Sequence, residues 1–139
     1  DLIVEINQLL PRISLLTPHR QEARRIARTA PPEDAARRRL ATGCQAVLVT
    51  GADESEDDRV LNQLYQPDSS HQWYYPNLPG QYHGSGGTLA ASTAARLALG
   101  ESLQQALTVA QEYTLQTLRQ DIHPGKGQAI PGRCTPCTN

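Results

Sequence analysis

The chain has 139 residues and a formal net charge of −1, with 38% hydrophobic and 19% charged residues. This composition is typical of one globular domain with a buried core and excludes a disordered chain. The balanced charge excludes a global field that would recruit nucleic acid or a membrane surface. No apolar run approaches the roughly 18 to 20 residues of a membrane span, so we expect neither a spanning helix nor a secretory signal peptide.

The chain begins at Asp1 and contains no Met. We therefore expect it to be a processed or truncated piece of a natural protein. Its three cysteines do not follow the pattern of a disulfide framework, which favours a reducing, cytoplasmic location.

The first elements alternate between helix and strand. Apolar residues recur at helical spacing over 2–10, and Pro11 ends that predicted helix. The short apolar run 13–16 predicts a buried strand. Thr17 then fits the N-cap of a further helix, with Pro18 at its first position.

A second helix and a strand follow. The helix is predicted over 32–42 and ends at Gly43, and the run 45–50 predicts a strand that ends at Gly51. The order strand, helix, helix, strand predicts a βαβ unit with parallel strands.

Two clusters of charge allow more than one interpretation. Residues 12–39 contain eight arginines and three acids, which fits either a phosphate or nucleic-acid patch or the solvated faces of two surface helices. The absence of interleaved aromatic residues favours the surface helices. Residues 53–58 contain five acids and predict an exposed loop, because they lack the glycine and the spacing of a calcium loop.

The second half of the chain predicts an antiparallel hairpin, two helices and a segment rich in Gly and Pro. The predicted bounds are 60–65 and 71–75 for the strands, the glycine segment to Leu99 for one helix, 101–120 for the other, and 121–139 for the tail.

The segment His83-Gly84-Ser85-Gly86-Gly87-Thr88 opens an apolar helical run. Its glycines permit a close backbone approach, and Ser85 or Thr88 is expected to cap the helix. The unpaired N–H groups of such a helix start bind anions, most often phosphate. Because the segment lacks the dinucleotide-binding pattern, its residues alone leave a phosphate site and a tight helix entry both open.

The cysteines predict no metal site. Cys134 and Cys137 have the spacing of half a zinc ribbon or of a redox pair, but no second pair accompanies them, which favours a loose tail. Cys44 is expected to be a small buried hydrophobe.

Three segments in order resemble one enzyme family. They are Leu15–Ala23 (LLTPHRQEA), Ala46–Gly51 (AVLVTG) and His83–Leu89 (HGSGGTL), and Gly125–Pro131 adds a weaker match. Together they resemble the C-terminal half of hydroxymethylpyrimidine/phosphomethylpyrimidine kinase, a thiamine-pathway enzyme of the ribokinase-like superfamily. The resemblance covers nearly the whole chain.

The resemblance implies a three-layer α/β ribokinase-like fold, with a mostly parallel sheet and an antiparallel hairpin. Residues 1–121 would form the C-terminal part of the kinase domain, and 122–139 a Gly/Pro-rich tail. The family's N-terminal half, with most of its pyrimidine contacts, has no counterpart in the sequence. The expected cofactors are ATP and Mg²⁺.

The resemblance also implies site residues. A Thr-Pro-Asn-x-x-Glu segment organises phosphate, magnesium and water in the family, and here Glu22 keeps the acid while His19 replaces the asparagine. Glu22 is therefore expected to act indirectly on magnesium. The residues expected to contact ATP are Glu22, Thr50, Gly51, His83 and Thr88, and those expected to form the anion hole are Gly84, Ser85 and Gly86.

Gly87 departs from the family, in which this position carries a Cys or Asp as the base for the acceptor hydroxyl. Loss of a general base typically slows a reaction about 10²–10⁴-fold. The resemblance thus predicts a kinase that transfers the ATP γ-phosphoryl group to hydroxymethylpyrimidine or its monophosphate. A catalytically impaired ligand-binding module of the same fold is the alternative. In either case we expect a homodimer that binds a small pyrimidine and neither nucleic acid nor membrane; an Arg-rich nucleic-acid binder is a third, weaker hypothesis.

Overall fold

The structure, a computed structural model, describes residues 2–28, 31–52 and 58–134. They belong to two units, an N-terminal unit Asp1–Asn77 and a C-terminal unit Leu78–Asn139. The acidic stretch 53–57, the residues 135–139 and with them Cys137 lie outside the described residues.

The N-terminal unit begins with the predicted helix. Helix α1 spans Leu2–Leu9 and continues into a 3₁₀ turn, Leu10–Arg12, that contains Pro11. Helix α3 spans Pro32–Ala41, close to its predicted bounds. It ends before Gly43, whose φ of +102° is a conformation that side chains disfavour.

The start predicted for the helix between α1 and α3 is wrong. Helix α2 spans Arg20–Ala27, and its N-cap is His19 rather than Thr17. The His19 side chain accepts a hydrogen bond from the Glu22 N–H, which is the bond that Ser, Thr, Asp or Asn usually accepts at this position. Pro18 is left in the extended stretch before the helix, where its carbonyl accepts from Thr50 N at 3.0 Å.

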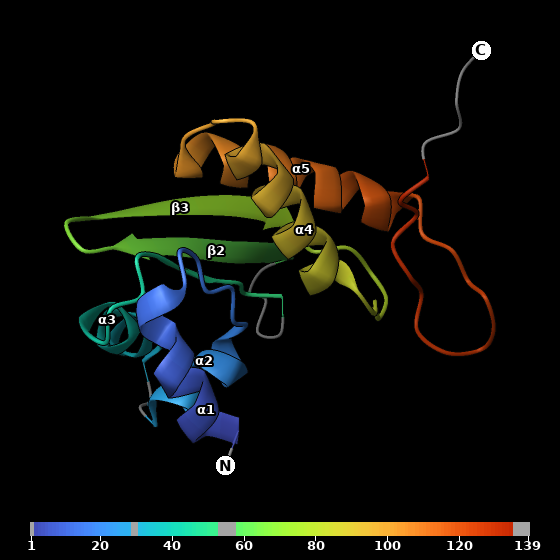
Figure 1. Cartoon of the computed structure of the whole chain (residues 1–139). Helices are drawn as coiled ribbons and strands as arrows, with labels where there is room; N and C mark the ends of the chain where they lie inside the picture. The colour runs from blue at the N-terminus through green and yellow to red at the C-terminus, as the bar shows by residue number, and fades with distance from the viewer. Residues whose placement is uncertain (1, 29–30, 53–57, 135–139) are drawn as a thin grey trace. The chain divides into compact units, whose positions relative to one another are not determined.

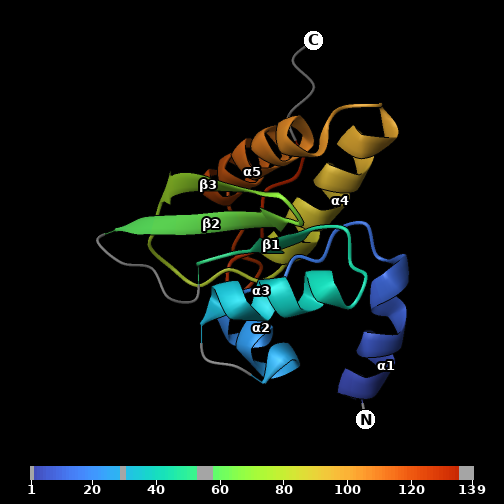
Figure 2. The same ribbon diagram turned by 90° about the vertical axis from the view of Figure 1, so that its left-hand side faces the viewer.

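The sheet of this unit has the strand order β1-β2-β3 (Figure 2). Strand β1 spans Val47–Val49, β2 Arg59–Gln66 and β3 Ser69–Pro76. All three pair antiparallel, and β2 and β3 form the predicted hairpin around a two-residue turn. The hairpin prediction is confirmed.

The extended stretch before α2 pairs in parallel with the segment that contains β1. Two isolated bridges join Leu16 to Val47 and His19 to Thr50 in parallel. Within the predicted strand 13–16 only Leu16 forms a bridge, so this stretch is not a regular strand. The helices α2 and α3 still connect two parallel segments, as the predicted βαβ unit requires.

The N-terminal core lies between the helices and the sheet. Helix α3 packs against α2, β1 and β2. The buried residues of this core are Leu10, Ala23, Ala35, Ala36, Cys44, Val47, Val49 and Tyr65. Cys44 is 2% exposed, so its prediction as a small buried hydrophobe is confirmed.

The C-terminal unit consists of two packed helices and a returning segment (Figure 1). Helix α4 spans Ser85–Ala98 and α5 spans Leu103–Arg119. Between them Gly100 has a φ of +87°, and Ser102 caps α5 by accepting from Gln105 N. No helix in the described part of the chain is long and apolar enough to cross a membrane.

The residues after α5 return to the unit instead of leaving it. We call Asp121–Cys134 the C-terminal strap. It forms bridges between Ile122 and Ile130 and between Tyr82 and Ala129. Gly132 N donates to the Thr117 carbonyl at 2.8 Å, and a Cβ on Gly132 would lie 1.9 Å from the Gln120 carbonyl oxygen. The strap is therefore closely packed at 129–132, whereas residues 122–128 are exposed.

Candidate functional site

The glycine turn, His83–Gly87, begins α4. Gly84 is the N-cap and has a φ of +96°, which explains a glycine at this position. The predicted cap by Ser85 or Thr88 is wrong, because the N-cap makes no side-chain hydrogen bond. The Thr88 hydroxyl instead donates back to the Gly84 carbonyl at 2.9 Å.

The glycine turn leaves backbone donors unused. The first intrahelical bond runs from Thr88 N to the Gly84 carbonyl at 3.0 Å. In the described part of the chain, no acceptor faces the N–H groups of Ser85, Gly86 and Gly87. Such a row of N–H groups at the positive end of a helix dipole binds anions.

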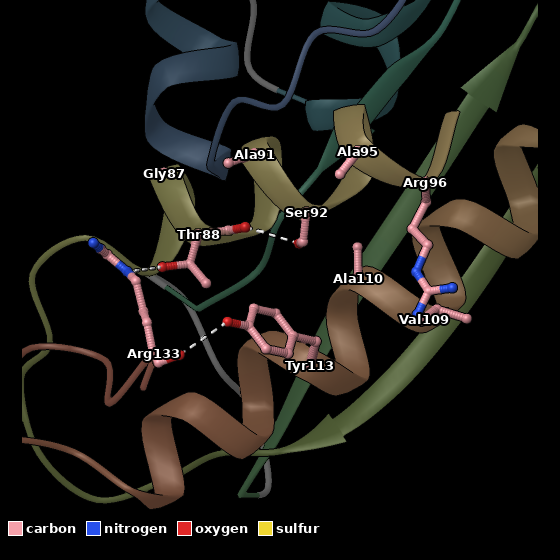
Figure 3. Close-up of a pocket in the computed structure, with 10 residues that line it drawn as sticks. All are labelled: Gly87, Thr88, Ala91, Ser92, Ala95, Arg96, Val109, Ala110, Tyr113 and Arg133. Carbon is pink, nitrogen blue, oxygen red and sulfur yellow. Dashed lines mark hydrogen bonds between the residues drawn. The ribbon is translucent and has the colours of Figure 1, made fainter. Parts of the chain in front are cut away.

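A pocket of about 660 Å³ adjoins the glycine turn between α4 and α5 (Figure 3). Its volume falls within the roughly 300–1,000 Å³ of typical ligand sites. It is lined by Gly87, Thr88, Ala91, Ser92, Ala95, Arg96, Val109, Ala110, Tyr113 and Arg133. Thus Gly87 and Thr88, both singled out from the sequence, border one pocket within the C-terminal unit.

The two central glycines of the turn face open space. A Cβ at Gly86 or Gly87 would meet no atom within 4 Å. Both residues are exposed, whereas Thr88 is 5% exposed. The fold therefore does not require glycine at 86 or 87 for steric reasons.

Arg133 is a residue of this pocket that the sequence interpretation missed. Its Nε donates to the Thr88 hydroxyl at 2.9 Å, and its Nη2 lies 3.4 Å from the Gly84 carbonyl oxygen. The residue belongs to the strap, which was expected to be a loose tail. No spacing rule connects two residues 45 positions apart, so no pattern in the sequence could have found the contact.

His83 is held by its backbone. Its N–H donates to the Ala129 carbonyl at 2.8 Å, and its side chain is exposed. This hydrogen bond with the strap fixes the backbone of His83, the first residue of the glycine turn.

In the N-terminal unit, His19 and Glu22 form a reciprocal capping box. His19 N donates to Glu22 Oε2 at 3.1 Å, while Glu22 N donates to His19 Nδ1 at 3.3 Å. The His19 Nε2 also lies 3.3 Å from Glu22 Oε1. The carboxylate is therefore oriented by the imidazole, although its side chain remains 52% exposed.

Thr50 and Gly51 lie at the end of β1 beside this cap. Thr50 bridges His19, and its carbonyl accepts from Arg20 N at 3.2 Å. Gly51 N donates to Asn62 Oδ1 at 3.1 Å, and a Cβ at Gly51 would lie 2.3 Å from the Leu61 carbonyl oxygen. The fold thus brings Glu22, Thr50 and Gly51 to one edge of the N-terminal unit.

The glycine turn and Glu22 can be compared with the two expected cofactors, ATP and Mg²⁺. The unpaired N–H groups of the glycine turn suit the phosphates of a nucleotide. Magnesium is commonly held by one or two carboxylates with water and substrate phosphates, which an exposed, oriented Glu22 permits. Among the described residues no group of three or more His, Cys, Asp or Glu residues is placed to hold a metal ion by itself.

The family model described as phosphomethylpyrimidine kinase matches residues 1–131. The chain is 34% identical over 136 residues to the hydroxymethylpyrimidine/phosphomethylpyrimidine kinase of Synechococcus elongatus, covering 94% of this chain and 52% of that protein. The corresponding enzyme of Mycobacterium bovis is 36% identical over 126 residues, covering 86% and 46%. The chain therefore spans about half the length of the curated relatives it matches.

The fold is shared with solved structures. The pyridoxal kinase of Staphylococcus aureus in complex with AMP-PCP superposes with a TM-score of 0.88 at 22% identity, covering 94% of this chain and 51% of that one. The predicted ribokinase-like α/β fold class and its antiparallel hairpin are thus confirmed. The expected mostly parallel sheet is not seen among the described strands, because β1, β2 and β3 pair antiparallel. With a family match over nearly its whole length, the chain belongs to the phosphomethylpyrimidine kinase family.

Proposed function

We propose that this chain is the C-terminal part of a thiamine-pathway kinase that transfers the γ-phosphoryl group of ATP to hydroxymethylpyrimidine or its monophosphate. The named relatives support this activity. The pyridoxal kinase that shares its fold binds AMP-PCP, an ATP analogue, which supports ATP as the phosphoryl donor.

The glycine turn carries the proposal. Phosphoryl transfer needs positioning and stabilisation of charge on the transferring oxygens rather than covalent participation of the protein. The amides of Ser85, Gly86 and Gly87 lack acceptors in the described residues, and the turn opens on the α4–α5 pocket. We assign these amides to the anion hole of the transferring phosphoryl group. Gly84, the left-handed N-cap, belongs to the same turn.

The other roles rest on the resemblance together with local geometry. Thr50 and Gly51 would line the nucleotide, and His83 and Thr88 would contact it beside the anion hole. Glu22, oriented by His19, would act on magnesium through water, and the ion would neutralise phosphate charge when bound.

A second candidate function follows from Gly87. The position assigned to the acceptor base has no side chain, and open space surrounds it. A ligand-binding module with little turnover is the function that this observation favours.

ADP release by the intact natural protein tests the kinase proposal. We expect ADP to form only when hydroxymethylpyrimidine or its monophosphate is present, with pyridoxal as the comparison acceptor. Absence of turnover, together with thermal stabilisation by ATP and the pyrimidine, would establish the binding module instead. Absence of both turnover and stabilisation would contradict both functions.

We also propose, from the resemblance, that the protein acts as a homodimer in the cytoplasm. Size-exclusion chromatography with light scattering tests the oligomeric state. A mass of one chain at micromolar concentration would contradict the dimer.

A further inference from the structure

We propose that Arg133 is a phosphate-contacting residue of this kinase, which places a guanidinium beside the anion hole at the mouth of the α4–α5 pocket. The inference rests on the function proposed for the glycine turn. It adds a residue that lies beyond the family match, since that match covers residues 1–131.

The backbone of the strap fixes Arg133 at the pocket. Its neighbour Gly132 donates from N to the Thr117 carbonyl at 2.8 Å. The Tyr113 hydroxyl, which borders the same pocket, lies 3.5 Å from the Arg133 carbonyl oxygen (Figure 3). The backbone at Arg133 thus lies beside α5, and its side chain reaches Thr88 of α4.

The guanidinium uses only part of its donor capacity on the protein. Nε donates to the Thr88 hydroxyl at 2.9 Å, and Nη2 approaches the Gly84 carbonyl at 3.4 Å. A guanidinium carries five N–H donors, so about three remain for a ligand. The side chain is exposed, so these donors are accessible.

The charge of Arg133 is not neutralised by an acid. Within residues 2–28, 31–52 and 58–134, no carboxylate lies within ion-pair distance of it. The second arginine of the pocket differs, because Arg96 Nη1 pairs with Glu101 Oε1 at 2.8 Å. The positive charge of the pocket is therefore concentrated at the end that borders Gly87 and Thr88.

This arrangement suits a phosphoryl group. A planar guanidinium can donate two parallel hydrogen bonds to phosphate oxygens, which adds both charge and orientation. The anion-hole amides supply neutral donors to the same group, so Arg133 would supply the full positive charge that they lack. A clamp that only holds Gly84 in its left-handed conformation is the structural alternative.

Calorimetric titration of ATP and of adenosine separates these roles. The two probes differ only in their phosphates. We expect Arg133→Gln to weaken ATP binding about 10–100-fold, as for loss of a charge-assisted hydrogen bond, and to leave adenosine binding unchanged. Arg119→Gln is the matched control, because Arg119 is an exposed cation of α5 outside the pocket, and it should bind both probes like the natural chain.

Two outcomes would overturn the inference. Equal ATP affinity in Arg133→Gln and the natural chain would exclude a phosphate contact, and an equal loss of ATP and adenosine binding would establish the structural clamp.

A measurement on the unsubstituted chain covers a variant that fails to fold. The Nε–H resonance of Arg133 should shift on addition of ATP and stay in place with adenosine. A shift of the Gly86 and Gly87 amides without a shift of Arg133 Nε–H would overturn the inference and leave the proposed function standing. If neither shifts, the proposed function itself fails.

Discussion

Gly51 at the end of β1 and the glycines Gly86 and Gly87 of the glycine turn are used in opposite ways. In the N-terminal unit, a Cβ on Gly51 would approach the Leu61 carbonyl oxygen to 2.3 Å, so only glycine fits. In the C-terminal unit, a Cβ on Gly86 or Gly87 would meet nothing within 4 Å. The fold thus requires glycine at Gly51, whereas Gly86 and Gly87 leave space that no other residue fills.

The polar groups of the two units differ in the same way. In the capping box the Glu22 carboxylate accepts from His19 N, and the His19 imidazole accepts from Glu22 N. The amides of Ser85, Gly86 and Gly87 have no acceptor among the described residues. N–H groups left free at the positive end of a helix are available to an anion, whereas the groups of the capping box already bond within the fold. This contrast makes the glycine turn the stronger candidate of the two regions.

The largest effect is expected on turnover, from adding a side chain at Gly87. Gly87→Cys or Gly87→Asp restores a side chain that can accept the proton of the acceptor hydroxyl. We expect ADP formation with hydroxymethylpyrimidine to rise about 10²–10⁴-fold, the typical contribution of a general base.

Gly87→Ala is the control for that experiment, because it occupies the same space without a base. It should leave turnover at the level of the natural chain. An equal rise in the Ala, Cys and Asp variants would show that helix stability, and not a base, limits the reaction.

The next largest effect is expected where glycine is required. Gly51→Ala forces a methyl group against backbone and should lower the free energy of unfolding by about 1–3 kcal/mol or more. Gly86→Ala, in the open first turn of α4, should instead raise it by up to about 1 kcal/mol, through helix propensity. Urea denaturation of both variants measures the difference, and equal free energies of unfolding would refute the contrast between the glycines.

A smaller effect is expected at the capping box. His19→Ala removes the acceptor of the Glu22 N–H and should cost about 1 kcal/mol of stability. His19→Asn, which keeps an N-capping side chain, should recover most of that loss in the same urea titration. If Asn is no better than Ala, the imidazole acts on more than the cap.

The smallest effect is expected from alkaline pH. Burial raises the pKa of the Cys44 thiol above its ordinary 9.0, and burial followed by the Glu33 charge raises the pKa of Tyr65 above 10.0. The folded chain keeps these protons at a pH where the unfolded chain has lost them. The free energy of unfolding, measured by urea denaturation, should therefore fall as the pH rises above 9. Tyr65→Phe should flatten the part of this decline above pH 10; an unchanged profile would contradict the assignment to Tyr65.

Local signals predicted most of the helices and the hairpin. The apolar spacing of α1, the glycine after α3 and the strands on either side of Pro67 and Asp68 act within a few residues, which is the range of sequence patterns. The start of α2 was predicted two residues too early, because His19 is not among the usual N-cap residues. The segment 13–16 pairs less regularly than its apolar composition implies.

The candidate site was predictable only in part. The glycine pattern located the turn, and the resemblance supplied the roles that remain proposals. The caps assigned to Ser85 and Thr88 were wrong, because the left-handed Gly84 begins the helix without a side-chain bond. Arg133 escaped prediction because its contacts with Thr88 and Gly84 depend on how the strap folds back, which no local pattern encodes.

Amide resonances during an ATP titration test the central claim most directly, namely that the glycine turn binds phosphate groups. ATP should shift the N–H resonances of Ser85, Gly86 and Gly87 strongly, and adenosine should leave them in place. Shifts confined to the arginines of residues 20–39, or an absence of shifts at the turn under saturating ATP, would contradict the account.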